Sequence, residues 1–191
     1  MRKAEVSRKT KETDINLALN LDGGDITVDT GIGFFDHMLT ALATHAGFGL
    51  TLTCTGDLEV DGHHTVEDVG IVLGTALAKA VSDKAGIARF GTAFIPMDEA
   101  LGFASVDISG RPFLVFDAFL PEEKVGDFDT CLTIEFMRAF AYNALITLHV
   151  QAQYGENSHH IIEAMFKAVA HALKTALKTD GNSVLSTKGS L

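Results

Sequence analysis

The sequence predicts an α+β fold made of two similar sheet-plus-helix halves, which are related by a pseudo-twofold axis. Two observations lead to this prediction. The order strand, strand, helix, strand, helix can be read twice along the chain. The uncommon pattern HHxxE opens the last helix of each half, as DGHHTVED at 61–68 and NSHHIIEA at 157–164. Neither half is long enough to bury both faces of its elements, so we expect a single domain, 1–191, with halves of about 1–92 and 93–191.

The first half begins with a strand and ends with a long helix. INLALNL places Ile15, Leu17 and Leu19 on one face, which is the period-two pattern of a strand with one buried side. Gly47 is placed to end the first helix and Gly86 the second. In order, we expect a strand at 15–21, a hairpin turn at 22–24, a strand at 25–30, a helix at 34–47, a strand at 48–56 and a helix at 63–86.

The second half repeats this order. Phe136, Met137 and Phe140 recur at helical spacing, and Asn157 or Ser158 is placed to cap the last helix. In order, we expect two strands within 100–119 that flank a turn at 109–110, a helix at 132–144, a strand at 145–155 and a helix at 159–177. The histidine pairs therefore lie at the same point of each half.

The composition excludes several classes of protein. The 191 residues carry 25 acidic and 15 basic side chains, for a net charge of −10, which disfavours nucleic acid as a partner. The basic residues near the start form either a solvated terminus or one wall of an anionic site. No apolar run is long enough to cross a membrane, and the N-terminal stretch lacks the apolar segment of a secretory signal. Cys54 and Cys131 have no metal-type or redox-type spacing, so we expect them to be reduced core or strand residues in a cytoplasmic protein.

The repeated HHxxE pattern suits metal binding. Residues four apart share a helix face, so His63 lies beside Glu67 and His159 beside Glu163. The second histidine of each pair points about 100° away and cannot easily serve the same ion. Two ions, each with ligands from more than one helix, fit this arrangement. Imidazole and carboxylate ligands without thiolate are suited to manganese, iron, nickel or zinc.

The remaining histidines are isolated and have a simpler explanation. His149 in a strand, and His45 and His171 in helices, lack a carboxylate at the same spacing. We expect them to be structural.

Several motifs together resemble the imidazoleglycerol-phosphate dehydratase family of histidine biosynthesis, in its monofunctional form. They are FFDHML, DGHHTVEDVGIVLGTAL, SGRP, NSHHIIEA and the terminal STKG, and the match runs in order from about residue 5 to the C-terminus. The resemblance implies a ribosomal S5 domain 2-like fold. It also implies a hydro-lyase that converts D-erythro-imidazoleglycerol phosphate to imidazole-acetol phosphate and water.

The resemblance also implies a cofactor, an assembly and a set of ligands. Two Mn²⁺ ions would occupy each active site, at interfaces within a 24-mer built from trimers. Glu135 stands at the place in the second half that answers His37 in the first. The implied metal ligands are His37, His63, His64, Glu67, Glu135, His159, His160 and Glu163.

Further residues are implied to bind the substrate. They are Glu12, Arg89, Arg111, Ser186, Thr187 and Lys188. Arginine and lysine suit the phosphate group. Glu12 is the candidate for acid–base catalysis, and Asp98 or Glu99, near the pseudo-symmetric position, could assist.

The chemistry of this substrate explains why the pattern is doubled. The hydroxyl group leaves from the carbon next to the imidazole ring, and the proton lost from the next carbon is not acidic. An imidazolate could expel hydroxide, and two metal ions could bind its two nitrogens. Two other classes use the same ligand types: a hydrolase with ions ~3.5–4 Å apart, and a metal-storage or assembly protein without a phosphate site.

Overall fold

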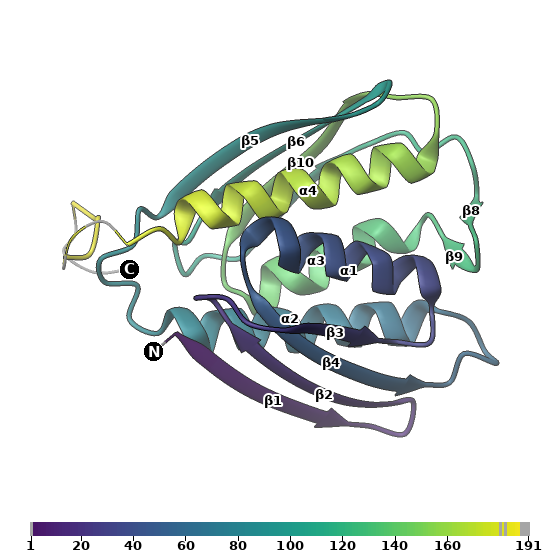
Figure 1. The fold of residues 1–191 in the computed structure, drawn as a ribbon, viewed down its shortest axis with the longest axis horizontal. Helices are drawn as coiled ribbons and strands as arrows, with labels where there is room; N and C mark the ends of the chain where they lie inside the picture. Colours follow the sequence, from purple (N-terminus) through teal and green to yellow (C-terminus); the bar gives the residue numbers. More distant parts are fainter. Residues whose placement is uncertain (1, 180, 182, 188–191) are drawn as a thin grey trace.

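The computed structural model describes residues 2–179, 181 and 183–187. Two four-stranded sheets lie on opposite sides of a layer of helices (Figure 1). The first sheet has the order β1 (Lys3–Lys9), β2 (Thr13–Asn20), β4 (Gly49–Gly56), β3 (Ile26–Asp29). The second has the order β5 (Phe90–Met97), β6 (Ala100–Asp107), β10 (Thr147–Tyr154), β7 (Phe113–Asp117). The helices are α1 (Gly33–Ala46), α2 (His63–Val81), α3 (Leu132–Asn143) and α4 (Ser158–Ala176).

The α+β class and the internal duplication are confirmed. Both halves run strand, strand, strand, helix, strand, helix, and the second adds a small hairpin of β8 (Lys124–Val125) and β9 (Phe128–Asp129). Each half therefore holds one strand more than predicted, β1 or β5, and both lie at a sheet edge. More than half of the residues of β1 are charged, and β5 contains Pro96. Such residues are common in edge strands, and they hid the strand pattern.

The predicted hairpin turn at 22–24 is wrong. β4 lies between β2 and β3, antiparallel to the first and parallel to the second. Parallel neighbours need a crossover connection, and α1 provides it. In the second half β10 lies between β6 and β7 in the same way. The true hairpins are β1–β2 and β5–β6, so their turns occupy equivalent places in the two halves.

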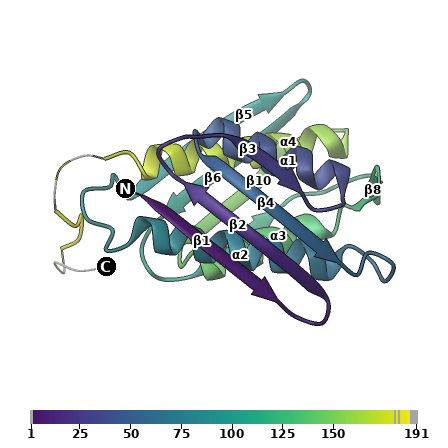
Figure 2. The same ribbon diagram turned by 60° about the horizontal axis from the view of Figure 1, so that its bottom comes forward.

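The helices form two closely packed pairs between the sheets, α1 with α4 and α2 with α3 (Figure 2). A Cβ atom at Gly74 would lie 2.5 Å from the carbonyl oxygen of Phe140, so glycine is what allows α2 and α3 to approach so closely. Phe136 and Phe166 stack with their ring centroids 5.2 Å apart in the common core. Each pair thus joins a helix of the first half to a helix of the second.

The helix ends place the histidine pairs together in space. All four helices begin at the same end of the molecule, on the right in Figure 1. Gly47 ends α1 in the left-handed conformation, as predicted, whereas α2 already ends at Val81 rather than at Gly86. No helix in the part of the chain that the structure describes is both long and apolar enough to cross a membrane.

Candidate metal centre

Side-chain hydrogen bonds to the backbone shape the starts of both α2 and α4, although only α4 has a capping side chain at its N-cap. The side chain of Asn157 accepts hydrogen bonds from the backbone N–H groups of His159 and His160, at 2.9 and 3.3 Å. This confirms Asn157 as the cap of α4. Asp61 accepts from the backbone N–H of His63 at 2.7 Å. Both pairs therefore lie in the first turn of a helix, where their rings can reach past the helix end.

Three of the predicted ligands come together between α1 and α4. Nε2 of His37 and Nε2 of His159 each lie 3.3 Å from Oε2 of Glu163. One ligand atom from each residue lies within 4.8 Å of the others, and this is the one group of three such side chains found among the described residues. The ring of Phe34 meets the His159 ring edge-on, with centroids 5.0 Å apart. We call these residues, His37, His159 and Glu163, the α1–α4 triad.

Glu163 is the buried member of the α1–α4 triad, since its side chain is only 8% exposed. Burial alone would raise the pKa of this carboxyl group. The hydrogen bond and the charge of Lys167, with Nζ 2.6 Å from Oε1, and the hydrogen bond from His37 outweigh burial and lower the pKa. The carboxylate is therefore ionised at neutral pH, and Oε2 is available to a cation between the two imidazole rings.

The counterparts of the α1–α4 triad in the other helix pair, His63 and Glu67 on α2 and Glu135 on α3, do not form a similarly close group. Nε2 of His63 lies 3.9 Å from Oε2 of Glu67, and both side chains are exposed. Glu135, the counterpart of His37, forms an ion pair with Arg138 one turn along α3. The structure thus places Glu135 on the expected helix, but its carboxylate is turned to a neighbouring cation.

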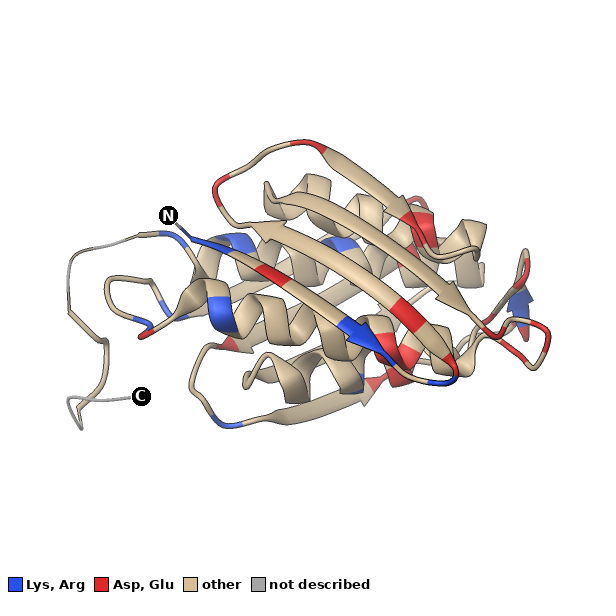
Figure 3. Cartoon of the chain, turned by 90° about the horizontal axis from the view of Figure 1, so that it is seen from below, with Lys and Arg blue, Asp and Glu red and all other residues tan. Residues whose placement is uncertain are grey.

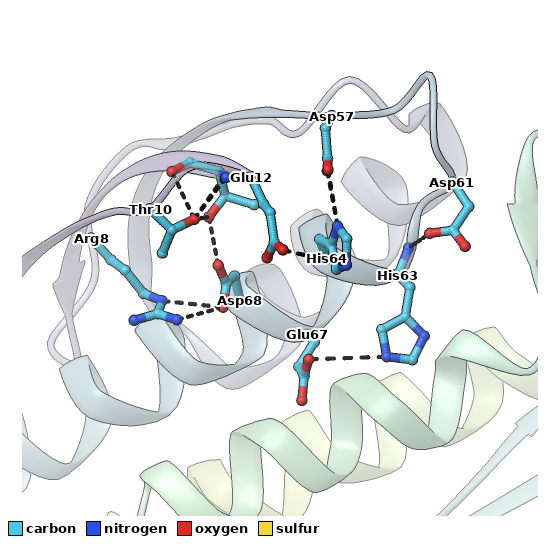
Figure 4. Close-up of polar contacts among 10 residues, drawn as sticks. Arg8, Thr10, Glu12, Asp57, Asp61, His63, His64, Glu67 and Asp68 are labelled. Atoms are coloured by element: carbon cyan, nitrogen blue, oxygen red, sulfur yellow. Dashed lines mark hydrogen bonds and ion pairs between the residues drawn. The ribbon is translucent and has the colours of Figure 1, made fainter.

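The second histidine of each pair points to a different set of carboxylates. Nδ1 of His64 lies 3.0 Å from Asp57, and its Nε2 lies 3.9 Å from Glu12 (Figure 4). The hydrogen bond with Asp57 raises the pKa of His64. Nearby, the guanidinium group of Arg8 in β1 donates two hydrogen bonds to the carboxylate of Asp68 in α2, which connects these two elements.

His160 repeats this arrangement in the other half. Its Nδ1 lies 2.7 Å from Oε2 of Glu99, and its Nε2 lies 3.8 Å from Asp98. The hydrogen bond with Glu99 raises the pKa of His160. The same bond, with two backbone N–H donors, lowers the pKa of Glu99 to about 2. Acidic residues gather toward this end of the molecule (Figure 3), which favours binding of a cation.

The predicted phosphate-binding residues lie at the opposite end. The backbone N–H of Arg89 bonds to the carbonyl of Ala176, the last residue of α4, whereas the histidines are in its first turn. At 1.5 Å per residue, α4 separates the two groups by about 27 Å. Within one chain, the predicted substrate contacts are therefore divided between two distant places.

Asp107 organises this second group. Its Oδ1 accepts a hydrogen bond from Nε of Arg89 at 2.7 Å. Nη2 of the mostly exposed Arg111 lies 3.4 Å from its Oδ2. Arg89 also donates to the carbonyl of Leu185, which draws in the segment that carries Ser186 and Thr187. Lys188 lies outside the described residues.

Sequence reasoning missed three of these partners, namely Asp57, Lys167 and Asp107. Asp57 directly follows β4 and Asp107 is the last residue of β6; Asp107 stands four residues before Arg111, but not in a helix, so this spacing gave no signal. Lys167 does stand four residues after Glu163 on α4, a spacing that could have revealed it.

The remaining histidines and the cysteines lie outside the α1–α4 triad. His45 and His171 face each other, with Nδ1 and Nε2 3.2 Å apart. Cys54 is buried in β4, as predicted, whereas Cys131 is exposed and is the residue before α3, so the prediction of a core or strand position is wrong for Cys131; both thiols are free.

Comparison with known proteins shows a similarity to one family. A family model described as imidazoleglycerol-phosphate dehydratase matches residues 30–173. Proteins of that name from Acetivibrio thermocellus and Thermoanaerobacter pseudethanolicus are 58% and 60% identical; each alignment covers 100% of this chain and 99% or 100% of the relative. The crystal structure of the Staphylococcus aureus enzyme is 44% identical, with a TM-score of 0.85 over 93% of this chain and 99% of its own. The Pyrococcus furiosus enzyme in complex with (S)-C348 is 40% identical, with a TM-score of 0.86 over 97% and 100%.

Proposed function

Because the chain belongs to the imidazoleglycerol-phosphate dehydratase family and is therefore a hydro-lyase, we propose that its substrate is D-erythro-imidazoleglycerol phosphate. The products would be imidazole-acetol phosphate and water, in histidine biosynthesis. We further propose that residues 1–191 act as a single dehydratase domain of two repeat halves, 1–92 and 93–191, in the cytoplasm.

The α1–α4 triad is the observation that carries this proposal. It offers two imidazole nitrogens and one ionised carboxylate within 4.8 Å of one another and no thiolate, which is a donor set suited to Mn²⁺. We propose two Mn²⁺ ions per active site. The residues that would hold them are His37, His159, His160 and Glu163, together with His63, His64, Glu67 and Glu135. When bound, such ions supply Lewis acidity, which makes the ring N–H of the substrate easier to remove.

After the ring N–H is removed, one further task in this reaction falls to a residue of the chain. With the ring N–H removed, the electrons of the ring expel the hydroxyl group from the adjacent carbon. We assign to Glu12 the removal of the proton from the next carbon; this is supported by its carboxylate, which is 52% exposed beside His64 and forms no ion pair with a lysine or arginine among the described residues. The ring nitrogen regains a proton and the enol that results becomes the ketone, so the net loss is one hydroxide and one proton, which leave as water.

The division of the chain into two distant groups supports a site shared between copies. A substrate this small cannot span about 27 Å, so the histidines of one chain must meet Arg89, Arg111, Ser186, Thr187 and Lys188 of another. Symmetric assembly is the ordinary way to bring such groups together. We propose that the assembly is a 24-mer built from trimers.

Product analysis tests the proposed function. Purified protein with Mn²⁺ should convert imidazoleglycerol phosphate to a ketone that retains its phosphate. Release of inorganic phosphate would instead identify a two-metal hydrolase. Tight metal binding with no change in the substrate would identify a storage protein. A Glu163→Gln variant, which lacks the carboxylate of the α1–α4 triad, serves as the matched control and should form no ketone.

A further inference from the structure

Glu99 occupies the position in the second half that Glu12 occupies in the first. Leu17 of β2 pairs with Leu52 of β4, and Ala104 of β6 pairs with Val150 of β10, so these pairs correspond in the two sheets. Glu12 and Glu99 each stand five residues before the β2 or β6 member, in the turn of an equivalent hairpin. A simple duplication would give the two carboxylates the same role.

Their contacts are nevertheless different. Oε2 of Glu99 accepts from Nδ1 of His160 at 2.7 Å, and Oε1 accepts from the backbone N–H groups of Glu156 and Asn157, at 3.1 and 2.9 Å. Both oxygens are thus engaged. The side chain of Glu12 only approaches Nε2 of His64, at 3.9 Å, and is more exposed than that of Glu99.

In the first half another residue binds the ring nitrogen. Nδ1 of His64 lies 3.0 Å from Asp57, which stands five residues after Leu52 in the loop before α2. Because β10 contains a one-residue bulge, the equivalent residue in the second half is Glu156, but there the carboxylate at Nδ1 of His160 is that of Glu99, and Glu156 contributes a backbone N–H bond to Glu99. Two different loops therefore bring a carboxylate to the same nitrogen of two corresponding histidines (Figure 4 shows the first).

The chemistry of these contacts is definite. An ionised carboxylate can only accept a hydrogen bond, so Nδ1 of each ring must carry the hydrogen. In the neutral ring the lone pair is then on Nε2, on the far side of the ring. A carboxylate or carbonyl in this position commonly fixes the tautomer and the orientation of a histidine that binds a metal.

We propose that Glu99 is a positioning residue, which holds the His160 ring with its Nε2 lone pair presented to a metal ion, as Asp57 does for His64. This inference rests on the proposed function, in which His160 is a ligand. The two corresponding carboxylates then have different roles: Glu99 orients a metal ligand, whereas Glu12 remains free for proton transfer.

Titration of metal-free protein with MnCl₂ in a calorimeter tests the proposal without relying on turnover. Glu99→Gln should weaken binding of Mn²⁺ by about 10- to 100-fold, the usual effect of losing such a partner. In a His160→Ala background the same substitution should cause no further loss, because Glu99 acts through that ring. A second loss of the same size would show that Glu99 acts only through the backbone of α4, and would overturn the proposal.

Two controls separate this role from others. Glu122 accepts from the backbone N–H of Ser158 at 2.8 Å, so Glu122→Gln removes a carboxylate from the same helix start without touching His160. It should leave the affinity for Mn²⁺ within about threefold, and so should Glu12→Gln, which should abolish turnover. Equal weakening by Glu122→Gln and Glu99→Gln would overturn the proposal. If the unmodified protein bound no Mn²⁺, the proposed function itself would fail.

Discussion

Two variants that are each impaired should restore activity when they assemble together. His159→Ala removes a member of the α1–α4 triad, and Arg111→Ala removes a mostly exposed arginine at the far end of α4. Loss of one charge-assisted bond to phosphate costs about 1.5–3 kcal/mol, or roughly 10- to 150-fold in kcat/KM. Neither substitution removes buried apolar surface, so both proteins should fold.

The expected recovery follows from the distance between the two positions. If one copy supplies His159 and another supplies Arg111, random mixing of the variants in equal amounts leaves about a quarter of the sites with both residues intact. The assay is the dehydration rate at low substrate concentration after the two proteins are expressed together. Activity no higher than the mean of the two variants alone would refute the inference that each site is shared.

A second mixture provides the control. A chain that carries both substitutions, mixed equally with the unmodified chain, should also give about a quarter of full activity. If a single chain supplied both residues, about half would remain.

Three further predictions concern packing, thiol reactivity and the coupling of the histidine pairs. Gly91→Ala should lower the free energy of unfolding by about 3 kcal/mol in urea titrations, because a Cβ atom there would collide with the carbonyl of Ala172 in α4; a change below about 0.5 kcal/mol would contradict this packing. Burial raises the pKa of Cys54 to about 11, so at pH 8 only about one thiol in a thousand is ionised; a thiol reagent should modify Cys131 alone until the protein unfolds. His63→Ala and His159→Ala should each abolish most activity, and the double variant should be little worse, whereas losses in kcat/KM that multiply would show independent sites.

The sequence predicted the helices and the candidate ligands better than the sheets. Helical spacing and the HHxxE pattern are local, so His63, His159 and their glutamates could be assigned from spacing alone. The partner of each strand is not local, because β4 and β10 are inserted between strands that neighbour each other in sequence. A turn signal such as DGG at 22–24 says that the chain reverses, but not which strand it then joins.

Side-chain partners from other loops could not be predicted either. Asp57 and Glu99 reach Nδ1 of corresponding histidines from different loops, which no common spacing describes. Glu135 was assigned by its equivalence to His37, but the arginine one turn away binds its carboxylate in the structure. The separation of Arg89 from the histidines also depends on the direction of α4 and is not visible in a one-dimensional pattern.

Turnover of metal-free protein, measured as Mn²⁺ is added, tests the central claim most directly. The claim is that the two histidine pairs and their glutamates form a centre for two metal ions that is required for dehydration. The account predicts no dehydration of imidazoleglycerol phosphate without metal and a rate that levels off at two Mn²⁺ ions per chain. Full activity without metal, or a rate that levels off at one ion per chain, would contradict it.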